Sequence, residues 1–210
     1  MIIAPSILSA NFGNLSESIE KVSSAEWLHV DVMDGHFVPN MSIGPVVVKG
    51  LRPYTSQVFD THLMISDPMK YAKEFVDAGS DRITFHIETV KDPMQMIEHL
   101  HELNVKVGVS IKPATSVESI APYLSKIDQV LVMSVEPGFG GQEFMMNSVL
   151  KIEELSRIRK KEGLSFLIAV DGGINKETAV FCKKAGADVL IAGSYVFKSD
   201  HPNGKVDSLR

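Results

Sequence analysis

Apolar residues recur along this chain in two alternating patterns. Eight short and nearly continuous apolar runs have the length and composition of strands that are buried on both faces of a parallel sheet. Longer segments lie between these runs, and their apolar residues recur every three or four positions, as on one face of an amphipathic helix. The predicted strands cover residues 2–8, 27–33, 57–64, 81–86, 105–111, 129–134, 166–170 and 188–192.

Capping residues mark the ends of the predicted helices. Asp67-Pro68 and Asp92-Pro93 each combine an aspartate cap with a proline at the first helical position. Gly163 is the expected stop of a long helix over residues 148–161. The other predicted caps are Asn14 or Ser16, Ser116 and Asn175.

Strict alternation of eight strands and helices predicts a parallel sheet. In 210 residues this pattern fits one domain, residues 1–210, folded as a (β/α)8 TIM barrel at the small end of its size range. An open doubly wound sheet is the alternative. The chain ends soon after strand 188–192, so we expect a short or truncated final helix that leaves this strand uncovered.

Histidine and aspartate side chains collect at the carboxyl ends of three predicted strands. His29 and Asp31 share one face of strand 27–33, His62 lies near the end of strand 57–64, and Asp171 follows strand 166–170. A lone strand histidine is more often a hydrogen-bonded core residue, but four unpaired polar groups at one end of a barrel would be costly to bury. We therefore predict one divalent metal ion on these four residues. Nitrogen and oxygen ligands suit Zn²⁺, Fe²⁺, Mn²⁺ or Co²⁺ alike.

Glycine-rich turns follow three strands at the same end of the predicted barrel. Backbone N–H groups of such turns can bind an anion, and phosphate sites of these barrels often use the loops after the seventh and eighth strands. Gly172-Gly173 and Gly193-Ser194 occupy those two places, which favours a phosphate site over simple chain reversal. The third turn is Gly138-Phe139-Gly140-Gly141.

Methionines end three of the predicted strands, namely Met33, Met64 and Met133. They fit equally well as core packing and as an apolar, polarisable wall that keeps water from a reacting substrate.

Composition narrows the classes of partner. A net charge of −5 argues against nucleic acid, and no apolar run approaches the ~20 residues of a membrane span. No signal peptide is visible, and the single cysteine, Cys182, excludes an intrachain disulfide. Cys182 lies in a helical pattern that indicates a packed thiol. These features predict a cytoplasmic protein with a small-molecule substrate.

A metal ion, two carboxylates and a phosphate site suit proton transfer next to a carbonyl group. Asp31 and Asp171 come from different strands, so one can remove a proton from a carbon and the other can return a proton to the opposite face. The metal stabilises the enediolate between the two steps. This sequence of steps inverts the carbon.

Six motifs in this chain resemble those of the ribulose-phosphate 3-epimerase family, in the family's order. They are APSIL (4–8), HVDVMDGHFVPN (29–40), HLM (62–64), VEPGFGGQ (135–142), VDGGI (170–174) and AGS (192–194). The second and fourth are long and highly specific.

The resemblance implies interconversion of D-ribulose 5-phosphate and D-xylulose 5-phosphate in the pentose phosphate pathway. It implies metal ligation by His29, Asp31, His62 and Asp171, with the two aspartates as the acid/base pair. It also implies a homo-oligomer, either a dimer or a hexamer. The implied substrate contacts are Ser6, His62, Gly138, Phe139, Gly140, Gly141, Gly172, Gly173, Gly193 and Ser194.

Three other functions stay open at this point. A D-allulose-6-phosphate 3-epimerase would use the same metal and phosphate residues and would differ around the middle carbons of its substrate. A metal-dependent hydrolase would release a product that an epimerase does not. A sugar-phosphate binding protein without turnover would not need both aspartates.

Overall fold

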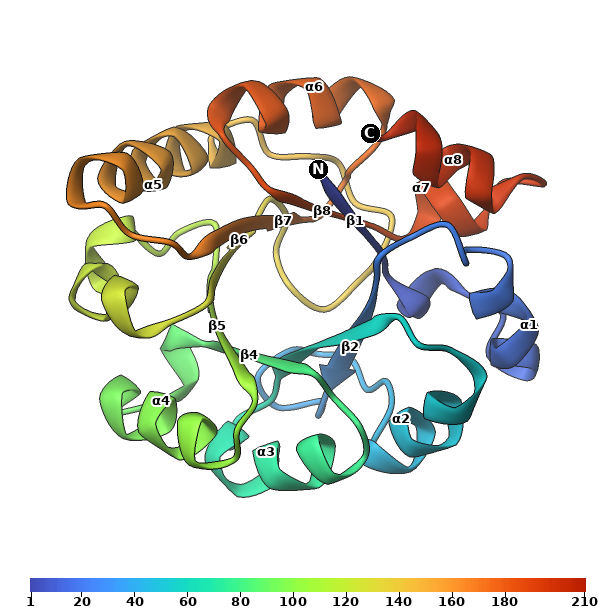
Figure 1. Ribbon diagram of the computed structural model, residues 1–210, viewed down its shortest axis with the longest axis horizontal. Helices are drawn as coiled ribbons and strands as arrows, with labels where there is room; N and C mark the ends of the chain where they lie inside the picture. The colour runs from blue at the N-terminus through green and yellow to red at the C-terminus, as the bar shows by residue number, and fades with distance from the viewer.

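All eight strands form one closed barrel, surrounded by helices, in the computed structural model of residues 1–210 (Figure 1). The strands pair in the order β1-β8-β7-β6-β5-β4-β3-β2, and every pair is parallel. An isolated parallel bridge between Ser6 and His29 closes the ring between β1 and β2. The predicted (β/α)8 TIM barrel is confirmed, and the open doubly wound alternative is wrong.

The elements follow the predicted alternation with small shifts at their ends. The strands are β1 Ile2–Pro5, β2 Trp27–Met33, β3 Val58–Met64, β4 Arg82–His86, β5 Lys106–Ile111, β6 Gln129–Met133, β7 Leu167–Asp171 and β8 Val189–Ala192. The α-helices are α1 Leu15–Glu20, α2 Pro45–Leu51, α3 Pro68–Asp77, α4 Pro93–Glu102, α5 Ser148–Glu162, α6 Lys176–Ala185, α7 Ser194–Phe197 and α8 Pro202–Ser208. Short 3-10 helices are η1 Ile7–Ser9, η2 Phe12–Asn14, η3 Arg52–Tyr54, η4 Ile87–Thr89, η5 Val117–Ser119 and η6 Ala121–Lys126.

Four of the predicted helix ends are confirmed by their hydrogen bonds or dihedral angles. The side chains of Asp67, Asp92 and Asn175 accept backbone N–H bonds in the first turns of α3, α4 and α6. Gly163 ends α5 with a φ of 66°, a left-handed conformation that glycine adopts without strain. These residues fix where α3, α4 and α6 begin and where α5 ends.

The predicted caps of the other two segments were wrong in detail. Ser116 makes no side-chain cap, and only 3-10 turns connect β5 to β6, with Pro122 interrupting any longer helix because it lacks an N–H donor. Asn14 precedes α1, but its side chain bonds to the Glu17 carboxylate and caps no backbone N–H.

The first strand is shorter than predicted. It ends at Pro5, and the chain turns directly into η1, where the Ser6 hydroxyl accepts the backbone N–H of Leu8 at 3.3 Å. This local hydrogen bond competes with further strand pairing. As a result Ser6 lies beside His29 of β2, at the cavity.

The last helices are short, as predicted, but they do cover the final strand. Helices α7 and α8 have 4 and 7 residues. Val196, Val206 and Leu209 are nevertheless fully buried, and β8 is no more than 1% exposed. The expectation of an uncovered eighth strand was therefore wrong, because a few well-placed apolar residues replace a long helix.

The apolar core continues from the barrel wall into the helix ring. Cys182 belongs to it as a fully buried residue of α6, and burial raises the pKa of its thiol to about 12, so it is a packed thiol as predicted. None of the helices combines the length and apolar character that a bilayer crossing requires.

Candidate active site

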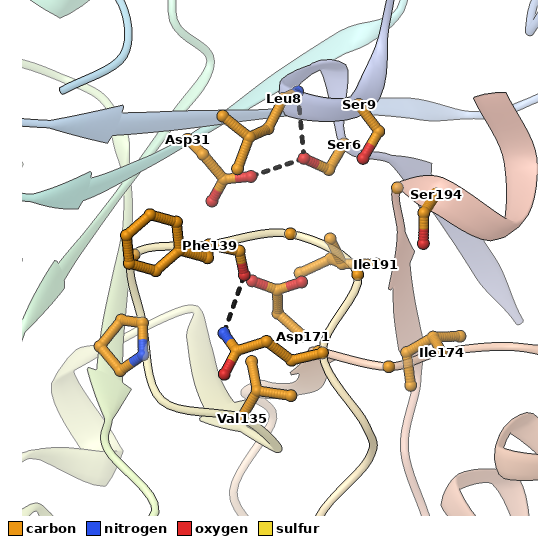
Figure 2. Close-up of a pocket in the computed structure, with 18 of the residues that line it drawn as sticks. Ser6, Leu8, Ser9, Asp31, Val135, Phe139, Asp171, Ile174, Ile191 and Ser194 are labelled. Atoms are coloured by element: carbon orange, nitrogen blue, oxygen red, sulfur yellow. Dashed lines mark hydrogen bonds between the residues drawn. The ribbon is translucent and has the colours of Figure 1, made fainter. Parts of the chain in front are cut away.

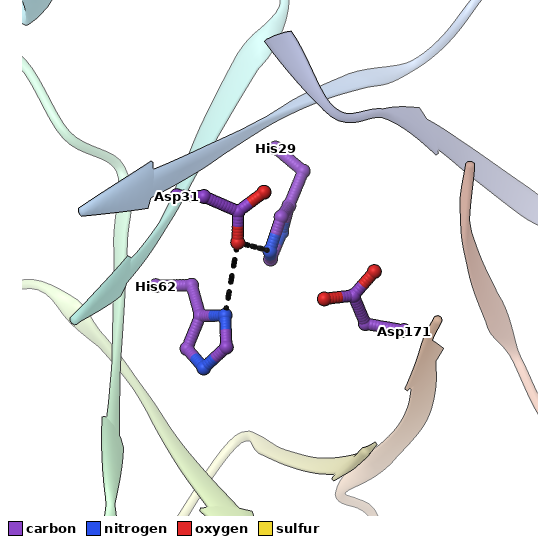
Figure 3. Close-up of side chains that lie close together, drawn as sticks. All are labelled: His29, Asp31, His62 and Asp171. Carbon is purple, nitrogen blue, oxygen red and sulfur yellow. Dashed lines mark hydrogen bonds and ion pairs between the residues drawn. The ribbon is translucent and has the colours of Figure 1, made fainter. Parts of the chain in front are cut away.

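His29, Asp31, His62 and Asp171 meet at the carboxyl end of the barrel (Figure 3). One potential ligand atom from each residue lies within 4.8 Å of those of the others. Asp31 Oδ1 is 3.3 Å from His29 Nε2 and 3.2 Å from His62 Nδ1. Two ligands of one metal ion at ~2 Å each are separated by about 3 Å, so these spacings fit a shared ion.

The pairing of β2 with β3 brings three of these side chains together. Register places His29 opposite Asp60 and Asp31 opposite His62. His29 Nδ1 lies 2.9 Å from Asp60 Oδ2, and both residues are fully buried. Since an ionised carboxylate only accepts, His29 donates from Nδ1, so in the neutral ring the lone pair is on Nε2. Burial opposes a charged ring, but Asp31 and then Asp60 raise the pKa of His29 well above its usual value, and a bound cation would favour the neutral ring.

That Nε2 atom points to a cation site. It is buried and makes no hydrogen bond, and its nearest charged neighbour is Asp31 Oδ1 at 3.3 Å. Buried polar atoms without a partner are uncommon and costly, and an imidazole nitrogen facing two carboxylates is a good donor to a cation. The residues therefore fit a divalent metal ion, while its identity stays open.

The two aspartates of the cluster have very different electrostatic surroundings. Burial alone would raise the pKa of Asp31, but His29 and then His62 lower it well below its usual range. Burial and then the charge of Asp31 raise the pKa of Asp171 to about 7. A bound divalent cation would favour the ionised form of both.

Above the cluster lies a cavity of about 300 Å³ (Figure 2). Asp31 and Asp171 line it, whereas His29 and His62 lie beneath it and are fully buried. The other predicted site residues all line this cavity: Ser6, Met33, Met64, Met133, Gly138, Phe139, Gly140, Gly141, Gly172, Gly173, Gly193 and Ser194. The structure thus brings the whole predicted set together, and the roles of its members stay predictions.

Ser6 contacts the cluster through Asp31. Its hydroxyl donates to Asp31 Oδ2 at 2.5 Å, so the two oxygens of this carboxylate face different partners. Ser6 is held by the turn that ends β1. It can therefore orient Asp31 as well as contact a substrate.

The three methionines form an apolar lining on the cavity. Met33, Met64 and Met133 are each no more than 5% exposed, and each contributes to the cavity surface. These side chains are thus buried and also face the space above the cluster, while their role in keeping water from a substrate stays a prediction.

The Gly172-Gly173 turn depends on glycine for both conformation and packing. The φ angles are 120° and 62°, and a Cβ at Gly173 would lie 2.5 Å from the Phe144 backbone nitrogen. Larger residues would therefore displace the neighbouring chain. The turn leaves its own backbone open to the cavity, beside Gly193 and Ser194 at the start of α7.

Asp34 links two loops at the mouth, and its charge gives a first prediction. Its carboxylate accepts from Ser66 N–H and hydroxyl, each at 2.7 Å, and from His36 and Phe37 N–H. Burial opposes ionisation, but these hydrogen bonds, those of Ser66 first, lower the pKa of Asp34 from 3.8 to about 2.

A lowered carboxylate pKa stabilises the fold above pH ~4, and this contribution disappears as the pH falls from ~4 to ~2. We expect Asp34→Asn to be less stable at pH 7, by about 1 kcal/mol, and to lose this part of the acid dependence. Urea unfolding of both proteins across this range measures the difference. The exposed Asp200→Asn variant is the control, and a difference curve that is flat with pH would contradict the prediction.

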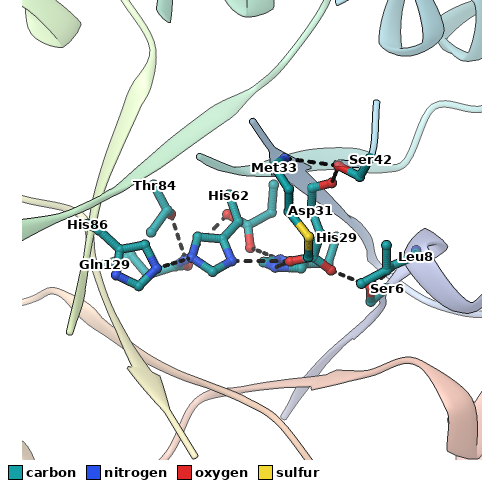
Figure 4. Close-up of polar contacts among 11 residues, drawn as sticks. Ser6, Leu8, His29, Asp31, Met33, Ser42, His62, Thr84, His86 and Gln129 are labelled. Atoms are coloured by element: carbon teal, nitrogen blue, oxygen red, sulfur yellow. Dashed lines mark hydrogen bonds and ion pairs between the residues drawn. The ribbon is translucent and has the colours of Figure 1, made fainter. Parts of the chain in front are cut away.

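Three partners of the cluster were not predicted, namely the buried Asp60 and His86 and the partly exposed Glu88. His62 Nε2 lies 2.9 Å from His86 Nε2 (Figure 4), and His86 Nδ1 lies 3.1 Å from Glu88 Oε2. His86 is the last residue of its apolar strand and His62 lies near the end of its own, so the same criterion could have found His86. Nothing in the sequence shows which neighbour each ligand bonds.

Comparison with known proteins gives one consistent family. The model of the ribulose-phosphate 3 epimerase family matches residues 2–197. The chain is 42% identical over 209 residues to ribulose-phosphate 3-epimerase of Mycobacterium tuberculosis (strain ATCC 25618 / H37Rv), covering all of this chain and 91% of that protein. It is 43% identical over 211 residues to ribulose-phosphate 3-epimerase of Bacillus subtilis (strain 168), covering 99% and 97%.

Solved structures of more distant proteins share the fold. KGPDC from Streptococcus mutans, also solved in complex with D-R5P, superposes with a TM-score of 0.74 at 14% identity, over 99% of this chain and 94% of that one. 3-Hexulose-6-phosphate synthase from Salmonella typhimurium gives 0.69 at 19% identity, over 100% and 96%. The family match and the two relatives above 40% identity show that the chain belongs to the ribulose-phosphate 3-epimerase family and is an isomerase.

Proposed function

We propose that this protein interconverts D-ribulose 5-phosphate and D-xylulose 5-phosphate, with a divalent metal ion as cofactor, in the pentose phosphate pathway. Family membership supports the reaction, and the cluster of two histidines and two aspartates supports its metal dependence. The two substrates differ only in configuration at C3, so the reaction needs a proton removed from one face of that carbon and returned on the other.

One observation carries the mechanism, the placement of Asp31 and Asp171. They belong to β2 and β7, point toward each other, and line the cavity from two sides (Figure 3). A sugar between them presents one face of C3 to each carboxylate. One aspartate takes the C3 proton, and the other gives a proton to the opposite face of the planar enediolate, which inverts the carbon.

The remaining residues bind, orient and exclude water. His29, His62 and both aspartates would hold the metal ion, which when bound supplies positive charge that stabilises the developing oxyanion. Ser6 orients Asp31, and the three methionines keep water from the reacting carbon. A dry site strengthens each of these electrostatic contacts.

The phosphate group fits the far side of the cavity. Gly172, Gly173, Gly193 and Ser194 line that part, and their backbone N–H groups can bind an anion without a charged side chain. The Gly138–Gly141 loop lies over the mouth, tied to the β2–α2 connection by a bond from Asn40 to the Gly138 carbonyl. It can close over the bound substrate.

Proton NMR in D₂O tests the proposal directly. Metal-loaded protein is mixed with D-ribulose 5-phosphate, and the C3–H signal is followed. We expect it to disappear while D-xylulose 5-phosphate forms.

Two outcomes would overturn this assignment. Exchange with D-allulose 6-phosphate but not with the pentose would keep the chemistry and change the substrate. Persistence of C3–H in both sugars, with each of several metals, would contradict the two-carboxylate mechanism.

Two further expectations stay predictions of the sequence, namely a homo-oligomer and a cytoplasmic location.

A further inference from the structure

A chain of three side chains, two buried histidines and the partly exposed Glu88, leads away from the predicted metal site. His62 Nδ1 faces Asp31 Oδ1, and His62 Nε2 lies 2.9 Å from His86 Nε2. His86 Nδ1 lies 3.1 Å from Glu88 Oε2 (Figure 4 shows the two histidines). Both imidazole rings are shielded from water, since each histidine side chain has 0% exposure.

The proton positions in this chain follow from simple rules. A neutral imidazole has one N–H and one lone pair. If His62 Nδ1 gives its lone pair to a metal ion, its Nε2 carries the hydrogen and donates to His86. His86 Nε2 must then accept, so His86 Nδ1 carries the hydrogen and donates to Glu88, which as a carboxylate only accepts.

The orientation of Glu88 is itself fixed by its neighbours. Its Oε1 accepts the Lys112 backbone N–H at 2.9 Å and the Thr115 hydroxyl. Lys151 secures this loop by donating to the carbonyls of Lys112, Pro113 and Thr115 at 2.8, 2.8 and 2.5 Å. Oε2 is therefore the oxygen that meets His86.

We propose that His86 and Glu88 are positioning residues that hold His62 as the Nε2–H tautomer, so that its Nδ1 lone pair is ready for the metal ion. A carboxylate that orients a metal-binding histidine is a recurrent arrangement, and Asp60 contacts His29 in this direct way. At His62, the Glu88 carboxylate acts through the imidazole ring of His86. This inference rests on the metal dependence in the proposed function.

The variant Glu88→Gln separates this role from a purely structural one. The Lys112 N–H can only donate, so it selects the amide oxygen of the new side chain, and the amide NH₂ group then faces His86 Nδ1. His86 must accept there and donate from Nε2, so His62 accepts at Nε2. His62 Nδ1 then carries a hydrogen that points at the metal position.

Glu88→Ala has a different effect. It removes the carboxylate without imposing a donor on His86, and the position is 22% exposed, so water can enter. His62 then loses its preference for one tautomer but is not forced into the wrong one.

The experiment is a Co²⁺ titration of each full-length protein, followed by absorbance and by competition with a chelator. We expect Glu88→Gln to weaken Co²⁺ binding by about 100-fold and Glu88→Ala by about 10-fold. A side chain that only fills space and bonds Lys112 would give the opposite order, because glutamine retains both. Glu98→Gln, the same change on the exposed face of α4, should bind as the original protein does.

Ring ¹⁵N NMR of His62 and His86 gives a readout independent of activity. The metal-loaded protein should show His62 protonated at Nε2 and His86 at Nδ1, and metal-free Glu88→Gln should show the reverse in both rings. Glu88→Gln binding within twofold of the original protein, or unchanged tautomers, would overturn this inference and leave the proposed function intact. Failure of the unaltered protein to bind Co²⁺ would instead contradict the metal dependence itself.

Discussion

Asp171→Asn is expected to lower the rate of pentose phosphate interconversion by about 10³-fold or more. Asp171 lines the cavity opposite Asp31, and general acid–base groups contribute ~10²–10⁴-fold to rates. An amide neither removes the C3 proton nor returns one. Coupled assays in both directions measure the loss.

Isotope exchange separates the acid/base role of Asp171 from its role as a metal ligand. With only Asp31 active, one of the two sugar phosphates should still exchange its C3 proton in D₂O, but without conversion into the other. In Asp31→Asn, the other sugar phosphate should be the one that exchanges its C3 proton. Loss of the metal ion alone would suppress exchange in both sugars.

A matched control is Asp77→Asn, which removes an exposed carboxylate at the end of α3, far from the barrel mouth. It should keep full activity. Interconversion by metal-loaded Asp171→Asn within tenfold of the original rate would exclude Asp171 as an acid or base.

The strands and the residues at their ends could be predicted because each is a local property of the sequence. His29, Asp31, His62 and Asp171 follow apolar runs, and parallel strands bring their carboxyl ends to the same edge. No knowledge of register was needed to place these four together. The same reasoning located the glycine turns and the methionines.

Interactions between strands could not be predicted, since they depend on register. His29 lies opposite Asp60, and Asp31 opposite His62, only because of the particular register in which β2 pairs with β3. The contacts of His29 with Asp60 and of His62 with His86 therefore could not be predicted. Strand β1 is shorter than predicted, because the hydrogen bond from the Leu8 N–H to the Ser6 hydroxyl favours a turn over further pairing.

The other large expected effect follows removal of the metal ion. Dialysis against a chelator should lower the isomerase activity to about 1% or less, since the divalent ion would be the main positive charge beside the enediolate. Lys198 is the only lysine or arginine that lines the cavity, and it is an exposed residue just after α7. Adding back Zn²⁺, Fe²⁺, Mn²⁺ or Co²⁺ should restore activity and identify the preferred ion.

Thermal unfolding provides a readout of metal binding that does not depend on catalysis. An ion at about 1,000 times its Kd stabilises the folded state by ~4 kcal/mol, which is a rise in Tm of roughly 10 °C for a chain of this size. His29→Ala should abolish this rise, because it removes one of the four potential ligand atoms of the ion. His101→Ala, an exposed histidine on α4, should retain it. Two results together would contradict the metal dependence, namely full activity in the chelated protein and no change in Tm on adding any of the four ions. The cluster would then be a hydrogen-bonded network, and the two aspartates alone would carry out the proton transfers.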